Sequence, residues 1–252
     1  WLEWSVVQQA SHVVVTCPEL AERLISRYPA ADRYRFSTIT NGYDPADDPS
    51  QRSAESDTAA GRKRFVLAYV GAFYREQSIE PVLQALRGLR GARADITTDV
   101  EFRLIGSLST AQRRLLRPDD AAFFTDAGYR SHEAALTEMA RADALLLMAP
   151  ANDGGRLCIP AKVFEYLAFG GHVLGYVHED TALHHLLSKA GNVTLVDCRR
   201  PESLAPAIER CYDAWRAGTL TAPRNREVVE QYRRDRLAAK FADIVGACVV
   251  AA

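Results

Sequence analysis

The stretch Ala149–Val177 reads APANDGGRLCIPAKVFEYLAFGGHVLGYV, and the fold of the chain is predicted outward from it. The apolar run at 144–148 precedes it and is short and well bounded, as a buried strand should be. A loop of turn-forming residues follows, and Pro160 stands where a helix would begin, because its fixed φ suits the first helical turn. A glycine pair ends this helix, and 172–177 predicts the next strand. Strand, glycine loop, helix and strand in this order form the unit with which an open α/β sheet holds an anionic ligand.

Lys162 and Glu165 lie three residues apart on the predicted helix, so their side chains are neighbours on one face. One interpretation is a cation close to the phosphates of a nucleotide, with a carboxylate that accepts hydrogen bonds from two ribose hydroxyls. The alternative is an exposed ion pair on the surface, which contributes little to stability. The spacing alone leaves both interpretations open.

Composition excludes several classes of function. The chain has 252 residues, 48% hydrophobic and 25% charged, which is typical of one large globular domain or one and a half smaller ones. Its net charge of −1 provides no basic field for nucleic acid or an anionic membrane. Five scattered cysteines without C-x-x-C spacing indicate neither a disulfide framework nor a zinc site, and a reducing cytoplasm fits them best. No apolar run approaches the roughly 20 residues of a membrane span, and no signal peptide is recognised.

Strands and helices alternate along most of the chain. Strands are expected at 12–16, 35–40, 65–70, 100–105, 121–125, 144–148, 172–177 and 193–196. Helices are expected at 1–10, 18–28, 79–89, 110–116, from Ser131 and Pro160 onward, and at 181–188, 201–216 and 224–249. A segment rich in Asp, Ser, Pro and Ala at 45–61 predicts a linker. The alternation predicts an α/β fold with a doubly wound, mostly parallel, Rossmann-like sheet.

Four segments resemble the retaining glycosyltransferases of the GT-B fold, a large family of bacterial enzymes that use nucleotide-sugar donors. The segments are STITNGYD at 37–44, YVGAFY at 69–74, Gly128–Tyr129, and IPAKVFEYLA at 159–168. The last contains the Pro-x-Lys-x-x-Glu-Tyr form of the family's donor-site helix and is the most specific. All four fall in the family's order, and the resemblance covers nearly the whole chain.

The resemblance implies a domain organisation. Residues 1–45 would be the C-terminal end of an incomplete acceptor domain, the remnant of a second Rossmann-like domain, and 46–61 the linker. Residues 62–222 would bind the nucleotide-sugar donor, and 223–252 would form a helix that packs back toward the acceptor domain. The chain also begins at Trp1 inside a predicted helix and without Met, so we expect a fragment of a longer protein. The fragment alone is expected to bind nucleotide without transferring sugar, because the acceptor domain completes the cleft.

The implied activity is transfer of a sugar from a nucleoside diphosphate sugar to an acceptor, with retention at the anomeric carbon. Lys162 and Arg75 would act at the diphosphate, as catalytic residues. The donor-binding residues would be Gly71, Tyr129, Arg130, Gly154, Gly155, Lys162 and Glu165. Their alternatives are an exposed loop arginine, ordinary turns at strand exits, and an exposed helix carboxylate. We expect no cofactor, since the nucleotide sugar is a substrate, and no metal, since no Asp-x-Asp motif stands in a suitable loop.

The sequence also departs from the family. Gln77 stands where a basic residue commonly contacts the diphosphate, Ala72 where Arg is frequent, and Leu157 eight residues before Glu165, where a second glutamate is usual. These departures motivate an alternative, a non-catalytic nucleotide-sugar binding module or degenerate transferase. A weaker alternative is a sugar-nucleotide epimerase with the same two-domain fold.

The expected partners are a nucleotide-sugar donor and an acceptor that is a glycan, a lipid-linked sugar or a small molecule. Nucleic acid is not expected. Peripheral membrane association through the missing domain stays open, as do the nucleobase, the sugar and the acceptor. Cys158, beside the glycine loop, is expected to be a small buried hydrophobe rather than a reactive thiol.

Overall fold

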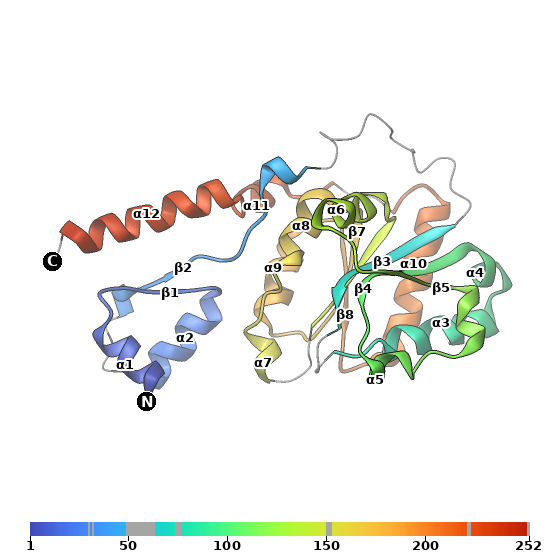
Figure 1. Cartoon of the computed structure of the whole chain (residues 1–252), viewed down its shortest axis with the longest axis horizontal. Coiled ribbons are helices and arrows are strands. Elements are labelled where there is room, and N and C mark those ends of the chain that lie inside the picture. The colour runs from blue at the N-terminus through green and yellow to red at the C-terminus, as the bar shows by residue number, and fades with distance from the viewer. Residues whose placement is uncertain are drawn as a thin grey trace.

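A computed structural model describes residues 1–29, 31, 33–48, 64–73, 77–149, 153–220 and 223–250 (Figure 1). Its strands are β1 (Val13–Val15), β2 (Phe36–Thr38), β3 (Phe65–Ala72), β4 (Val100–Ser107), β5 (Phe124–Gly128), β6 (Ala144–Met148), β7 (His172–Val177) and β8 (Val193–Asp197). Its α-helices are α1 (Leu2–Gln9), α2 (Pro18–Arg27), α3 (Glu80–Ala92), α4 (Ala94–Asp99), α5 (Thr110–Arg113), α6 (His132–Arg141), α7 (Asp153–Arg156), α8 (Lys162–Phe169), α9 (Ala182–Ala190), α10 (Leu204–Arg216), α11 (Arg226–Glu230) and α12 (Arg234–Val250).

The larger sheet has the strand order β5-β4-β3-β6-β7-β8, and every neighbouring pair in it is parallel. Strands β3 to β5 are added in one direction and β6 to β8 in the other, so the order reverses between β3 and β6. Open α/β sheets bind ligands at the carboxyl ends of the strands beside such a reversal. The predicted α/β class and the mostly parallel, doubly wound sheet are confirmed.

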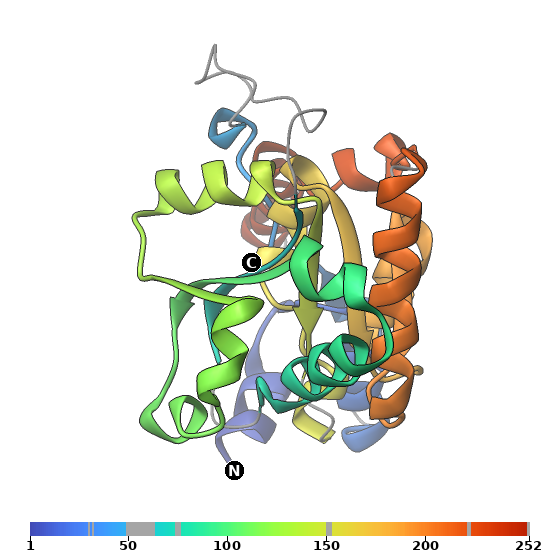
Figure 2. The same ribbon diagram turned by 90° about the vertical axis from the view of Figure 1, so that its right-hand side faces the viewer.

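Helices cover both faces of this sheet (Figure 2). Alternate residues of β3 divide between the two faces, as the period of a strand requires. Phe65, Leu67 and Tyr69 pack in one buried cluster with side chains of α3 and α10. Val66 and Ala68 belong to a second cluster with side chains of α6, α8 and α9. The sheet is therefore buried on both sides, which explains why its strands read as continuous apolar runs.

A second, two-stranded parallel sheet, β1-β2, carries α1 and α2 and lies apart from the larger one (Figure 1). Its small core contains Val7, Val15 and Leu24. The Cys17 thiol donates a hydrogen bond to the Leu157 carbonyl (3.4 Å), which attaches this unit to the loop before α8. The domain boundaries named above remain predictions, and most of the linker at 46–61 lies outside the described residues.

Two segments differ most from the elements expected. The strand expected at 121–125 begins at Phe124, because Pro118–Ala122 forms a 3-10 helix. Its Asp120 is buried and accepts a hydrogen bond from Arg87 on α3 (Nε to Oδ1, 2.9 Å), a contact between distant parts of the chain. Gly128 is the last residue of β5.

The single helix expected at 224–249 is instead two helices, α11 and α12, broken between Glu230 and Arg234. The break is held by backbone hydrogen bonds to Tyr43, which donates to the Tyr232 carbonyl (3.1 Å) and accepts from the Arg234 amide (2.9 Å). Two helices that the sequence did not predict are also present, α4 before β4 and the four-residue α7 inside the glycine loop.

Candidate functional site

The candidate site lies where the amino end of α8 meets the carboxyl end of β3. Helix α8 begins at Lys162, two residues after the expected Pro160, with Ala161 as its N-cap residue. Tyr166, one turn further along, is fully buried, and its hydroxyl oxygen accepts a hydrogen bond from the Val70 amide (2.8 Å). Burial raises the pKa of the Tyr166 hydroxyl far above its ordinary value, so it stays protonated. Tyr166 therefore fixes α8 against the end of β3, and with it the position of Lys162.

The Lys162 side chain extends across the end of β3. Its Nζ donates a hydrogen bond to the Val70 carbonyl (3.2 Å) and lies 3.7 Å from the centre of the Tyr69 ring. Among the described residues, no carboxylate forms an ion pair with it. Burial without a counter-charge lowers the pKa of Lys162 from 10.5 to about 7. The site thus holds an ammonium group at the sheet reversal that would gain from a nearby anion.

Glu165 occupies a different environment from Lys162, although the two are three residues apart. Its carboxylate forms no hydrogen bond or ion pair within the described part of the chain, so the pair with Lys162 that the spacing allowed is absent there. Burial raises the pKa of Glu165, and Asp47 adds to this effect, while the charges of His132 and Arg234 oppose it. A half-buried carboxylate with unused acceptor oxygens is suited to bind hydroxyl groups.

Glycines at the ends of β3 and β4 bring the backbones of these two neighbouring strands close together. Gly71 and Gly106 are paired across β3 and β4 and have φ values of +123° and +155°. A Cβ on Gly106 would lie 1.9 Å from the Gly71 carbonyl oxygen, and a Cβ on Gly71 would lie 3.3 Å from Lys162 Nζ. The backbone of Gly71 therefore lies directly beside the Lys162 ammonium, with no side chain between them, and its close approach to phosphate remains a prediction.

The other predicted site residues are placed as follows. Tyr129 (85% exposed) and Arg130 (also exposed) follow β5 at the same edge of the sheet as the end of β4. Gly154 and Gly155 lie in α7, so the expected open glycine loop contains a helical turn. Arg75 lies outside the described residues. The roles assigned to these residues remain predictions, and the structure brings Lys162 and Gly71 together most closely.

A hydrogen-bond network beneath Lys162 was not foreseen from the sequence. The Tyr69 hydroxyl donates to Gln77 Oε1 (3.1 Å), and Gln77 Nε2 donates to the Met148 carbonyl (2.9 Å) at the end of β6. Gln112 Nε2 on α5 donates to the Gln77 carbonyl (3.0 Å). Gln77, which replaces the family's basic residue, therefore joins the ends of β3 and β6 and supports the ring against which Lys162 packs. A polar residue between two apolar elements was the only sign in the sequence that Gln77 forms such bonds. One of its partners, Met148, is too distant in sequence to be predicted.

The described residues contain no group of three or more His, Cys, Asp or Glu side chains arranged to hold a metal ion. They also contain no helix with the length and apolar character that crossing a membrane would require. Cys158 is exposed, so the expectation that it is a buried small hydrophobe is wrong, because the loop before α8 lies at the surface there.

Comparison with known proteins gives structural matches alone. No protein-family model and no curated protein sequence matches the chain. Sucrose-phosphate synthase from Thermosynechococcus elongatus is 21% identical, with a TM-score of 0.70 over 100% of this chain and 61% of that one. HepE of Anabaena, solved in complex with UDP and glucose, is 14% identical, with a TM-score of 0.66 over 96% and 64%. The UDP-forming α,α-trehalose-phosphate synthase from Burkholderia vietnamiensis is 13% identical, with a TM-score of 0.66 over 95% and 60%.

The chain thus spans about three fifths of the length of the solved structures that it matches. At these identities the likeness concerns the fold, and the similar structures are glycosyltransferases. The parallel sheet, its reversal between β3 and β6, and these matches together give the chain the Rossmann-like α/β fold of GT-B glycosyltransferases.

Proposed function

We propose that this chain carries the nucleotide-sugar donor site of a retaining glycosyltransferase. The observation that supports it most is the Lys162 ammonium, which has no ion-pair partner among the described residues and lies beside the Gly71 backbone at the sheet reversal. Diphosphate oxygens placed there would meet a cation and the exposed amino end of α8. The match to a protein solved with UDP and glucose supports a nucleoside diphosphate sugar as the ligand class.

In this proposal the task of the protein is electrostatic. When the bond between the sugar and the diphosphate breaks, negative charge develops on the leaving phosphate oxygens. Lys162 stabilises that charge if it is protonated, and a bound diphosphate raises its pKa from about 7 toward its ordinary value because opposite charges favour each other. Retention, Arg75 as a second cation and independence from metal ions are further parts of the proposal that rest on the resemblance.

Glu165 is assigned to the ribose. Glu165 lies on the helix that carries Lys162 but in a different environment. Its free carboxylate oxygens would accept hydrogen bonds from the two ribose hydroxyls. Asp47 and His132, which contact each other (Oδ2 to Nε2, 3.1 Å), border the same region from the segment after β2 and from α6.

The test is calorimetric titration of the chain with UDP, GDP, ADP and dTDP. We expect one of them to bind and Glu165→Ala to weaken that binding by about 1.5–3 kcal/mol, the usual contribution of a hydrogen bond to a charged group. Glu202→Ala, which removes an exposed carboxylate from the 3-10 helix before α10, is the matched control. Equal affinity in Glu165→Ala and the control would remove Glu165 from the site.

The binding-module alternative is favoured by one observation, the use of both ends of the Gln77 amide in holding Tyr69 and Met148. A glutamine so engaged cannot take the place of the missing cation. The alternative predicts nucleotide binding without hydrolysis or transfer of the bound sugar, even when the chain is joined to an acceptor domain. Measuring release of UDP from UDP-glucose by such a joined protein would separate the two functions.

A further inference from the structure

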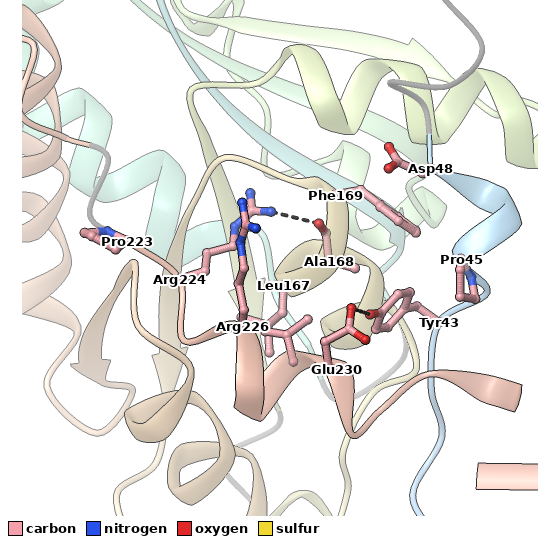
Figure 3. Close-up of a pocket in the computed structure, with 11 residues that line it drawn as sticks. Tyr43, Pro45, Asp48, Leu167, Ala168, Phe169, Pro223, Arg224, Arg226 and Glu230 are labelled. Atoms are coloured by element: carbon pink, nitrogen blue, oxygen red, sulfur yellow. Dashed lines mark hydrogen bonds between the residues drawn. The ribbon is translucent and has the colours of Figure 1, made fainter. Parts of the chain in front are cut away.

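A cavity of about 640 Å³ lies at the carboxyl end of α8, the end opposite to Lys162 (Figure 3). Three segments line it, the residues that follow β2, the end of α8, and the chain from Pro223 through α11. Its lining residues are Tyr43, Pro45, Asp48, Leu167, Ala168, Phe169, Pro223, Arg224, Arg226, Val229 and Glu230. The cavity contains none of the residues assigned to the donor site, and its size is typical of small-molecule sites.

Arg224 is half-buried in this wall and is held in place from both sides. Its Nη1 donates to the Ala168 carbonyl (2.8 Å), and the amide of the next residue, Asn225, donates to the Ala190 carbonyl (2.8 Å). No carboxylate pairs with it in the part of the chain that the structure describes, and burial lowers its pKa. Its remaining guanidinium N–H groups are free to bind another acceptor.

Arg226 lies two residues further on and lines the same cavity. In Figure 3 its side chain extends in the same direction as that of Arg224. It forms no ion pair with any described residue. Its helix carries two acidic residues, Glu227 and Glu230, and the one that lines the cavity, Glu230, is already engaged. Glu230 accepts from the Tyr43 hydroxyl (3.4 Å) and pairs with Arg233 and Arg236 (3.3 Å each). Two guanidinium groups thus line one cavity without a carboxylate between them.

The opposite wall is aromatic. Tyr43 and Phe169 pack edge to face, with ring centres 5.4 Å apart and planes at 88°. Asp48 lies beside Phe169 in Figure 3, on the side away from the arginines. A ligand in the cavity would therefore meet cations at one end and ring surfaces at the other.

We propose that this cavity binds an organic phosphate monoester, with its phosphate on Arg224 and Arg226 and its organic part against Tyr43 and Phe169. The planar guanidinium fork matches phosphate oxygens in pairs, and arginine is the preferred residue for such contacts. The cavity is much larger than a bare phosphate, so an organic part that packs against the rings of Tyr43 and Phe169 completes the fit.

The test is titration of the intact chain with phenyl phosphate, with inorganic phosphate as the comparison. We expect phenyl phosphate to bind more tightly, and Arg226→Gln to weaken its binding about tenfold, the effect of one charge-assisted hydrogen bond. Arg226 is exposed and forms no hydrogen bond or ion pair with a described residue, so its replacement should leave the fold intact. Arg224→Gln also loses the bond to Ala168, and its binding result counts only if its unfolding temperature is unchanged. Arg210→Gln, at an exposed position of α10, is the control for the lost charge.

Lys162→Gln separates this site from the donor site. We expect it to leave phenyl phosphate binding unchanged, whether or not Lys162 binds a nucleotide. Loss of binding in Lys162→Gln, or equal effects of the changes at Arg226 and Arg210, would overturn the proposal. Equal affinity for inorganic phosphate would overturn the organic part, and absence of binding would overturn the whole proposal.

Discussion

The protonation of Lys162 makes a prediction about stability that needs no ligand. Its pKa is about 7 in the folded protein and 10.5 in the unfolded chain. Between these values the unfolded chain holds a proton that the folded protein has lost, so rising pH favours folding. The cost of keeping the ammonium in the folded protein is fully present below about pH 7 and is relieved progressively up to about pH 10.5.

The size of the effect follows from the same values. Each pH unit in this window contributes at most about 1.4 kcal/mol per proton. Between pH 7.5 and 9.0 the wild-type free energy of unfolding should therefore rise by about 1–2 kcal/mol relative to Lys162→Met. The lower end of that range allows for the hydrogen bond to Val70 and the contact with the Tyr69 ring, which favour the charged form.

Urea unfolding of both proteins at several pH values measures this difference. The subtraction removes the contribution of every other titrating group, provided that the m-values of the two proteins agree. A difference that stays constant from pH 7.5 to 9.0 would refute the argument, because it would mean that Lys162 is protonated equally in the folded and unfolded protein.

Three further predictions concern other parts of the chain. The affinity of the wild type for the nucleoside diphosphate that it binds most tightly should fall above pH 7, by up to about tenfold per pH unit. The affinity of Lys162→Met should not fall in this way, and titration of both proteins at pH 6.5 and 8.5 checks this. Gly106→Ala should lower the free energy of unfolding by more than about 2 kcal/mol, since its Cβ would meet the Gly71 carbonyl, and normal stability in urea would contradict the backbone geometry. Asp120→Asn should lower the free energy of unfolding by about 3 kcal/mol, because it leaves Arg87 without its counter-charge. The pair with Arg87 lowers the pKa of Asp120 below 3.8. Its contribution to wild-type stability should therefore disappear as the pH falls below 3.8 and through that lowered pKa, and acid unfolding measures this loss.

The elements that the sequence predicts best are those decided by local pattern. The strands at 144–148 and 172–177 have the bounds expected, because each is an apolar run closed by turn residues at both ends. The helix expected from Ser131 also begins there because of a local contact, since the Ser131 hydroxyl caps α6 by accepting from the Ala134 amide. The errors come from contacts between distant residues. The bond between Arg87 and Asp120 displaces β5, and the bonds between Tyr43 and the segment after α11 divide the last helix.

The parts of the site that depend on local sequence pattern were likewise predictable, and the parts that depend on distant contacts were not. The motif placed Lys162 and Glu165 on one helix, and the order of elements placed that helix at the end of β3. The spacing could not tell that Lys162 would turn toward Val70 and the Tyr69 ring instead of toward Glu165, because that choice depends on a strand about ninety residues away. Arg224 and Arg226 were hidden for the same reason, since both fell in a segment that reads as part of a long helix.

The contact between Tyr43 and the break before α12 has a mechanical consequence. The chain passes from the small sheet to the large one through Tyr43 and returns toward it through Arg234, and these two passages are hydrogen-bonded to each other. They touch closely, since a Cβ on Gly42 would lie 2.1 Å from the Tyr232 carbonyl oxygen. Two connections joined at this point resist separation and sliding of the units, and rotation about it would require breaking the second attachment, the bond from Cys17 to Leu157. Tyr43 therefore marks the pivot about which the two sheets would turn.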